Sequence, residues 1–427
     1  MTRNASSHSM HLLLIAPAAP PKNSPEAMQV GRFLAALDPT VRVTLVTTPV
    51  VRGWEWEDAT LTINRPGLQV ITLSLPAHRF TQRVLANRYF ATLHVPDSDF
   101  WLPWLADQVV ARLDAVPDVI YSRSAPFAAA LLARRLKRRL NRPWMMHLSD
   151  PWSSSPYRVL SPRIASTDRA LEADCVADAD LIALTTDGQA AYYRDRYPDR
   201  AAAITVTPNM MPLSSGIQID FCHPRPTATA LGALTLVHTG ALYGSRNPDG
   251  LLLALTLLRR RYPNLAQRVR VYFIGNMPPD VTARIDASPE CIRRPPISFD
   301  LATKLQSEAD FVLSIEPKAV DPLHCHFLLS KVVDYLSSGR PILALTDPAS
   351  LTAKYCSKGY GWAFAPDDAE GIAAFLERLL TTKMPLHGFK IPLPPAELEP
   401  FMVTRCIAHH LQLLAATYPN QESVYGR

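Results

Sequence analysis

The sequence has no long hydrophobic run. No segment of its 427 residues approaches the roughly 20 consecutive apolar residues that a membrane-spanning helix needs. The first apolar run, residues 12–17, is too short to be the core of a signal peptide, and residues 1–9 are polar. We therefore expect a cytoplasmic protein.

Cysteine is scarce, and two glycine motifs are missing. The six cysteines are scattered and form no C-x-x-C pair, which disfavours a disulfide framework or a zinc site. Neither the dinucleotide fingerprint G-x-G-x-x-G nor the phosphate loop G-x-x-x-x-G-K-[ST] occurs. These absences argue against a dehydrogenase and against a nucleotide triphosphatase.

The composition is that of a globular protein. Hydrophobic residues make up 48% and charged residues 19% of a chain that is long enough for two or three domains. The net charge of +6 is mild for this length, so we expect no nucleic-acid partner. The charge does permit attraction to anionic lipid or to phosphorylated ligands.

Strand and helix patterns alternate along the chain, pause, and then restart. Apolar runs predict the strands, at residues 11–16, 43–48, 118–124, 143–148, 181–185, 204–207, 234–238, 269–274, 311–315 and 341–345. Ser24, Pro25 and Glu26 predict the start of the first helix. This alternation predicts an α/β protein with two doubly wound, Rossmann-like domains.

The predicted domain boundaries follow the same pattern. We expect an N-terminal domain at residues 1–212 and a second domain at residues 233–398. A linker rich in proline, serine and threonine is expected between them, at residues 213–232. An apolar stripe at helical spacing predicts a helix within residues 399–427, which we expect to return toward the N-terminal domain.

Two features of the first half suggest contact with a surface. The helix expected at residues 126–140 carries five basic residues, Arg134, Arg135, Lys137, Arg138 and Arg139. Four tryptophans add aromatic weight, at positions 54, 56, 101 and 104. A solvated basic face and core packing are the ordinary explanations. The alternative hypothesis is peripheral contact with the inner face of an anionic membrane.

Residues 327–348 are the most informative stretch, because they read as a helix, a tight turn and a buried strand. Ser330 is expected to cap the helix, and Gly339 to end it. Lys331 and Asp334 are three residues apart and so share one helix face. A lysine suits a phosphate, and a carboxylate suits the paired hydroxyls of a sugar. A solvated surface ion pair is the alternative interpretation.

Two loops are further candidates for a ligand site. In residues 239–246, Gly240 lets backbone amides approach a ligand, while Arg246 and the following helix start supply positive potential. A plain strand-to-helix turn would also use glycine. In the first half, Asp150 follows a predicted strand end, where doubly wound folds bind ligands.

Three short patterns look like metal motifs. Two match D-x-D, at residues 97–99 and 178–180, and the third is the H-C-H of residues 324–326. Such triplets arise by chance, and the histidine pair has no second cluster in the sequence. We therefore expect neither a metal nor a cofactor.

Together these segments resemble the GT-B glycosyltransferases, and in particular the bacterial family 4 glycosyltransferases of polysaccharide and exopolysaccharide assembly. The matching segments occur in family order, at residues 95–105, 118–152, 171–186, 204–210, 236–255, 308–317 and 327–348. The resemblance implies transfer of a sugar from a nucleotide diphosphate sugar to an acceptor hydroxyl, in a cleft between two facing domains. The acceptor would be a glycan, a lipid-linked molecule or another hydroxyl compound.

The resemblance also implies roles for individual residues. Gly240 and Arg246 would lie near the donor phosphates, Lys331 would contact the diphosphate, and Asp334 the ribose hydroxyls. Pro296 and Ile297 would border the base. Asp150 would face the acceptor as a base or positioning group, with His147 as a weaker candidate. Transfer with retention, without a metal, is the mechanism that the family implies.

The sequence departs from the family pattern at the donor sugar. In the family's E-x7-E pattern, Asp334 replaces the second glutamate and His326 the first. Glu316, from the preceding loop, is a candidate substitute. These departures leave two alternatives open, a nucleotide-sugar epimerase on the same fold and a GT-B binding or scaffold protein without catalysis.

Overall fold

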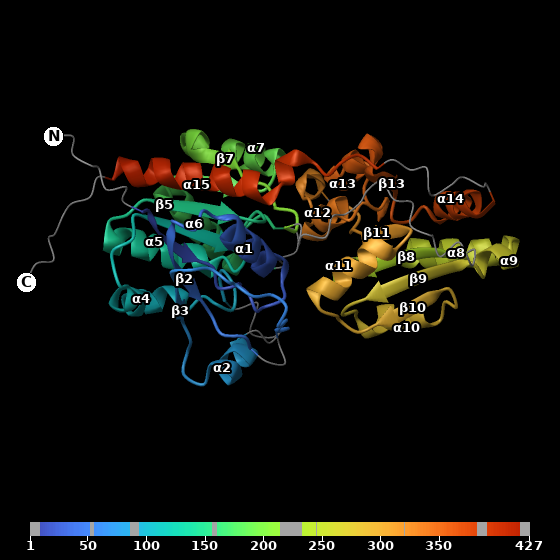
Figure 1. Cartoon of the computed structure of the whole chain (residues 1–427), viewed down its shortest axis with the longest axis horizontal. Helices are drawn as coiled ribbons and strands as arrows, with labels where there is room; N and C mark the ends of the chain where they lie inside the picture. The colour runs from blue at the N-terminus through green and yellow to red at the C-terminus, as the bar shows by residue number, and fades with distance from the viewer. Residues whose placement is uncertain are drawn as a thin grey trace, which may run out of the picture. The chain divides into compact units, whose positions relative to one another are not determined.

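The computed structural model describes residues 9–51, 55–85, 94–155, 160–213, 233–244, 246–319, 321–381 and 391–418. The chain divides into two compact units (Figure 1). Unit 1 comprises Met1–Met210 and Glu399–Arg427, and unit 2 comprises Met211–Leu398. Of the predicted linker, residues 214–232 lie outside the described residues.

Unit 1 is built on a parallel sheet of seven strands in the order β3-β2-β1-β4-β5-β6-β7. The strands are β1 (His11–Ile15), β2 (Arg42–Thr47), β3 (Leu68–Thr72), β4 (Val119–Ser124), β5 (Trp144–Leu148), β6 (Leu181–Leu184) and β7 (Ile204–Val206). The strand order reverses between β1 and β4. In such sheets ligands bind outside the carboxyl ends of the strands at the reversal point.

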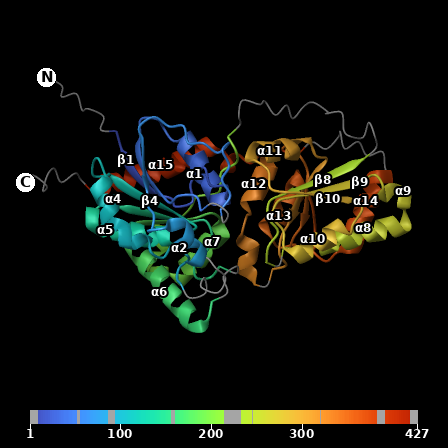
Figure 2. The same cartoon turned by 90° about the horizontal axis from the view of Figure 1, so that it is seen from below.

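Helices cover both faces of this sheet (Figures 1 and 2). One face packs against α1 (Pro25–Ala36) and α15 (Pro400–Thr417). The other face packs against α4 (Ala106–Arg112), α5 (Ala128–Leu140), α6 (Pro162–Asp178) and α7 (Asp187–Arg196). The C-terminal helix therefore belongs to the core of unit 1, through Val403, Ile407 and Leu411.

Unit 2 repeats this plan with six parallel strands in the order β10-β9-β8-β11-β12-β13. They are β8 (Leu234–Thr239), β9 (Val269–Ile274), β10 (Cys291–Arg294), β11 (Phe311–Ile315), β12 (Ile342–Leu345) and β13 (Gly361–Phe364). One face carries α8 (Asp249–Arg261), α10 (Pro279–Asp286) and α14 (Ala369–Thr381). The other carries α11 (Phe299–Glu308) and α12 (Ser330–Ser337), and the order reverses between β8 and β11.

The prediction of two doubly wound sheets is confirmed. The start of α1 is also confirmed, since Ser24 accepts a hydrogen bond from the Ala27 amide. The expected cap of α12 is wrong, because the cap position is Leu329 and no side chain caps it. Between β2 and β4, where no strand or helix was predicted, the chain contains β3, α2 (His78–Leu85), a 3-10 turn (Leu102–Leu105) and α4.

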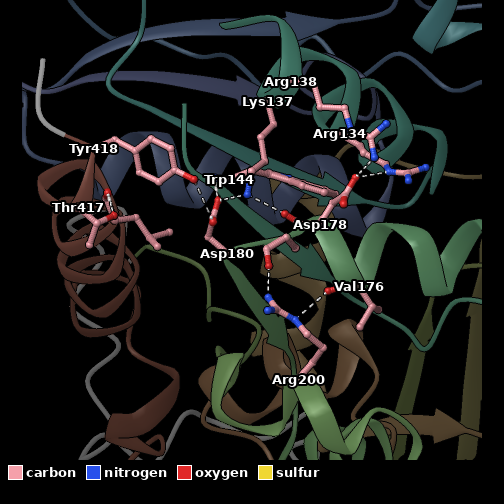
Figure 3. Close-up of polar contacts among 12 residues, drawn as sticks. Arg134, Lys137, Arg138, Trp144, Val176, Asp178, Asp180, Arg200, Thr417 and Tyr418 are labelled. Atoms are coloured by element: carbon pink, nitrogen blue, oxygen red, sulfur yellow. Dashed lines mark hydrogen bonds and ion pairs between the residues drawn. The ribbon is translucent and has the colours of Figure 1, made fainter. Parts of the chain in front are cut away.

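The basic residues of α5 are largely paired within unit 1 (Figure 3). Arg134 Nε and Arg138 Nη2 donate to Asp178 at 2.6 and 2.5 Å, and Lys137 Nζ donates to Asp180 at 2.6 Å. The acids of this second D-x-D triplet are therefore ion-pair partners. Because these partners offset its charge, α5 is not the bare cationic face that a membrane contact through it would require.

Asp180 also joins elements that are distant in the sequence. It accepts a hydrogen bond from the Trp144 amide at 2.7 Å and one from the Tyr418 hydroxyl at 3.4 Å (Figure 3). The carboxylate thus connects the first residue of β5, the end of α15 and Lys137 of α5. Among the described helices, none combines the length and hydrophobicity of a membrane span.

We expect Asp180→Ala to lower the free energy of unfolding by about 1–3 kcal/mol, because it leaves the Trp144 amide without its acceptor and removes the ion pair of Lys137. Asp107→Ala is the matched control, since Asp107 of α4 pairs with Arg139 of α5 at an exposed site. Its effect should stay below about 1 kcal/mol. Urea unfolding of the full chain measures both, and equal losses would contradict the role given to Asp180.

Candidate functional site

The candidate site of unit 2 lies at the carboxyl edge of its sheet, where the strand order reverses. β8 leads directly into Gly240, and β11 leads into Glu316. Helix α12, which follows β11, brings Lys331 to the same place. Three segments far apart in the sequence therefore meet at the point where doubly wound folds bind ligands.

Lys331 contacts the end of β8. Its Nζ lies 3.5 Å from Nε2 of His238, and Nδ1 of His238 lies 2.9 Å from the Leu313 carbonyl. Because a carbonyl only accepts, Nδ1 carries the proton and Nε2 faces the lysine as an acceptor. Burial, and then the charge of Lys331, hold the pKa of His238 well below its ordinary value. His238 therefore stays neutral.

Gly240 gives the lysine room. Its φ of 117° lies in the left-handed region, and a Cβ there would stand 3.0 Å from Lys331 Nζ. Gly275, at the end of β9, is equally constrained, since its Cβ would meet the Gly240 carbonyl oxygen at 2.4 Å. Any side chain at either position would displace this loop or the lysine. The missing side chain at Gly240 consequently leaves space beside the lysine, while the Gly240 amide donates to the Ile274 carbonyl at 2.8 Å.

Helix α12 is fixed to the same loop by a buried tyrosine. The Thr239 amide donates to the Tyr335 hydroxyl at 3.2 Å, and that hydroxyl donates to the Leu313 carbonyl at 3.4 Å. Gln306 of α11 adds a bond to the Thr239 hydroxyl at 2.8 Å. These contacts set the position of α12, and hence of Lys331, relative to the end of β8.

Two cations share the site. Arg246 is buried, with its guanidinium 4.5 Å from the centre of the Tyr243 ring. Burial, followed by the charge of Arg246, lowers the pKa of Lys331 to about 7, while Glu316 opposes the shift. The two positive charges repel each other, and a bound anion would offset that repulsion. The site therefore has the electrostatics of an anion-binding site.

Glu316 is hydrogen-bonded to three hydroxyl groups of unit 2. Its carboxylate accepts from the hydroxyls of Ser314 at 3.1 Å, Thr346 at 2.7 Å and Thr352 at 2.6 Å. Burial raises its pKa, and these hydroxyls and Arg246 oppose that shift. The arrangement ties together the ends of β11 and β12, which differs from the sugar contact expected from the sequence.

The other expected donor residues lie around this edge. Asp334 is buried on α12, one turn beyond Lys331. His326 is half-buried at the end of the 3-10 turn that precedes α12. Pro296 and Ile297 are half-buried in the loop between β10 and α11, where Ile297 packs beside Val237 and Ile274.

In unit 1, the two residues that were expected to be catalytic differ in their exposure to solvent. Asp150 is exposed just beyond the end of β5. His147 is fully buried, with Nδ1 2.7 Å from the Tyr121 hydroxyl and 3.1 Å from Arg123 Nη1. Burial, and then Arg123, hold the pKa of His147 well below its ordinary value. His147 is therefore a neutral core residue, because no part of it reaches the surface.

The sequence did not indicate the buried arginine behind Asp150. Arg123 is almost fully buried, and its Nε donates to Glu26 Oε1 at 2.6 Å. Glu26 Oε2 accepts a short hydrogen bond from the Ser149 hydroxyl. A buried acid–base pair thus reaches the residue next to Asp150. The only signal in the sequence was a charged residue, between Ser122 and Ser124, at the end of a strand that begins with apolar residues.

The first D-x-D triplet also has a structural use. Asp97 Oδ2 accepts from the Phe127 and Ala128 amides at 2.6 and 3.2 Å, at the start of α5. In the part of the chain that the structure describes, no group of three or more histidine, cysteine, aspartate or glutamate residues is placed to hold a metal ion.

Comparison with known proteins bears on this geometry. Residues 26–210 match the family model of the glycosyl transferase 4-like domain. No significant match was found among curated protein sequences. Solved structures match nearly the whole chain at low identity, and their likeness shows the fold, that of the GT-B glycosyltransferases.

Three of the similar structures illustrate the match. An α,α-trehalose-phosphate synthase (UDP-forming) from Burkholderia vietnamiensis has a TM-score of 0.64 at 13% identity, covering 96% of this chain and 100% of its own. Staphylococcus aureus MnaA with UDP has a TM-score of 0.57 at 12% identity, with 98% and 100% covered. Anabaena HepE in complex with UDP has a TM-score of 0.58 at 14% identity, with 95% and 100% covered.

We expect the affinity of this anion site for a nucleoside diphosphate, used as an anionic probe, to fall between pH 7 and pH 9, by up to about tenfold per pH unit. A bound diphosphate favours the protonated lysine, so above pH 7 binding must take up a proton on Lys331, whereas the probe itself is almost fully ionised over this range. Titration calorimetry in two buffers counts that proton. Lys331→Met should bind weakly with no such slope, and a flat wild-type profile would contradict the assignment.

Proposed function

We propose that this chain, which has the GT-B fold and matches the glycosyl transferase 4-like domain at residues 26–210, is a glycosyltransferase that transfers a sugar from a nucleotide diphosphate sugar to an acceptor hydroxyl. The observation that carries this proposal is Lys331, whose ammonium lies between His238 and Gly240 with Arg246 close enough to lower its pKa. A diphosphate is the anion that suits this site.

The chemistry that we propose begins at the anomeric carbon of the donor. Breaking the bond to the sugar leaves a nucleoside diphosphate, and fixed cations and amides stabilise the charge that develops on it. Lys331 and Arg246 supply that stabilisation, and Gly240 leaves space beside the lysine for the diphosphate, so the proposed reaction needs neither a metal nor a cofactor besides the donor. We propose retention of configuration, with a leaving phosphate oxygen taking the proton of the acceptor hydroxyl.

The remaining donor contacts are assigned by position. We propose that Asp334 binds the ribose hydroxyls, that His326 faces the sugar, and that Pro296 and Ile297 border the base. Two of the similar structures contain UDP, which makes uracil the first base to test. Asp150, in unit 1, would orient the hydroxyl of a glycan or lipid-linked acceptor.

The test is thermal unfolding with UDP, GDP, ADP, CMP and NAD in turn, on the wild type and on Lys331→Met. A nucleoside diphosphate at about one hundred times its Kd should stabilise the wild type by about 2.7 kcal/mol. The methionine variant should lose this effect, yet without ligand it should be at least as stable as the wild type, because it removes a buried charge.

Three outcomes would contradict the proposal. No stabilisation by any nucleoside diphosphate would remove the donor site, and stabilisation by NAD alone would point to a different ligand class. Interconversion of two nucleotide sugars without an acceptor would replace transfer with epimerisation.

We also propose that any contact of unit 1 with an anionic membrane is made by α2. Arg79, Phe80, Arg83 and Val84 are exposed, and their spacing places them on one face of this helix. The polar Gln82 is the buried residue. A helix that turns Phe80, 72% exposed, outward between two arginines has the character of an interfacial helix.

Vesicle flotation tests this surface. Wild-type protein should float with vesicles of phosphatidylcholine and phosphatidylserine but not with phosphatidylcholine alone, and Arg79→Glu with Phe80→Ser should abolish flotation. Arg139→Glu is the control, because it reverses an exposed charge on α5. Wild-type protein that stays in solution, or equal loss in the control, would refute the proposal.

A further inference from the structure

The segment that carries Asp150 is held unusually firmly for a surface loop. We define residues 149–155 as the Asp150 loop. Asp150 itself is exposed, but Trp152 is fully buried and its ring stacks on Phe127 with centroids 5.3 Å apart and planes 12° apart. The exposed carboxylate is therefore two residues from a rigid aromatic anchor.

Two buried acids on α6 bind this loop. Asp168 and Glu172 lie four residues apart, so they share one helix face, and both are fully buried. Asp168 Oδ1 accepts from the Trp152 indole at 2.9 Å. Glu172 Oε2 accepts from the Ser153 amide at 3.3 Å and, by a short bond, from the Ser153 hydroxyl.

A tyrosine of α7 closes the same network. The Trp152 amide donates to the Tyr193 hydroxyl at 2.9 Å, and that hydroxyl donates to Glu172 Oε1 in a short bond. Burial, and then the charge of Glu172, raise the pKa of Tyr193 well above its ordinary value, so the hydroxyl keeps its proton. Arg196 lies 3.7 Å from Glu172 and donates to the Ser153 hydroxyl at 3.2 Å.

The other end of the loop is held from different elements. The Ser149 hydroxyl donates to Glu26 of α1, and the Thr185 hydroxyl, just after β6, donates to the Ser149 carbonyl at 3.1 Å. Arg123 fixes Glu26 in turn. Asp150 therefore stands between two clamped points, one on each side of it in the sequence.

Buried carboxylates are costly unless their hydrogen bonds are complete, and here three of them serve one loop. Apolar packing alone would suffice to close a surface loop. We propose that Glu172 is a positioning residue, which fixes the direction of Asp150 through Ser153 and Tyr193 so that the carboxylate orients the acceptor hydroxyl. The inference rests on the proposed function of Asp150.

The experiment compares Glu172→Gln with Asp178→Asn. Both variants remove one negative charge from α6, but Asp178 is the last residue of the helix, where it binds Arg134 and Arg138 (Figure 3). The readouts are amide hydrogen exchange of residues 149–155, UDP binding, and turnover of UDP-glucose with octyl glucoside as acceptor probe, with UDP-glucose hydrolysis measured alongside.

For Glu172→Gln we expect faster exchange in the Asp150 loop and roughly a hundredfold lower kcat for transfer, with UDP binding and hydrolysis near wild type. Asp178→Asn should leave the loop and the transfer-to-hydrolysis ratio unchanged. Should Glu172→Gln fail to fold, Tyr193→Phe provides the second variant, because it removes only the hydroxyl between Trp152 and Glu172.

Each other outcome overturns the inference. Unchanged exchange in Glu172→Gln would show that Glu172 does not hold the loop. Faster exchange with a wild-type rate of transfer would show that a fixed loop is not needed for the reaction. An equal loss of transfer in Asp178→Asn would show that Glu172 only stabilises the fold. If Asp150→Asn transfers sugar as fast as the wild type, or if the wild type transfers none, the proposed function itself fails. The exchange result still describes how the loop is held.

Discussion

Burial of the Lys331 ammonium is the constraint to which the carboxyl edge of unit 2 is adapted. An ammonium group loses hydration when it is buried, and a second cation, Arg246, adds repulsion. The neighbours compensate in different ways. Gly240 has no side chain to fill the space, His238 presents a lone pair, and Glu316 supplies the opposite charge.

In unit 1 the buried charges that bind the Asp150 loop are carboxylates instead of cations. Glu26, Asp168 and Glu172 are buried, and each has hydrogen-bond donors from the Asp150 loop. The two edges therefore differ in kind. The edge of unit 2 is electrostatically incomplete without an anion, whereas the Asp150 loop is already held in place by its own unit.

The sequence was a good guide to what depends on neighbouring residues. Strand–helix alternation predicted both sheets, and the order of Ser24, Pro25 and Glu26 predicted the start of α1, because capping acts over three or four residues. The short edge strand β3 and the helix α2 were missed. Both expose apolar residues, Val70 and Phe80, so the periodicity that reveals a buried face is weak there.

Contacts between strands could not be read from the sequence. His147 was a catalytic candidate through the family resemblance, but its partner Arg123 lies opposite it in the register of β4 and β5. His238 was overlooked since nothing local links it to Lys331, which follows 93 residues later. Lys331 and Gly240 were recognised as candidates from their local patterns, although their contact depends on the sheet.

The position of α15 also determines the order in which the molecule can be completed. The sheet face of unit 1 that carries Leu12, Leu14 and Val119 is covered by α1 together with α15, and α15 begins at Pro400. A ribosome makes all of unit 2, residues 211–398, before it makes this helix. During synthesis the first unit to begin folding is thus the last to be completed, and the part of its apolar sheet face that α15 covers stays exposed while an entire second unit forms.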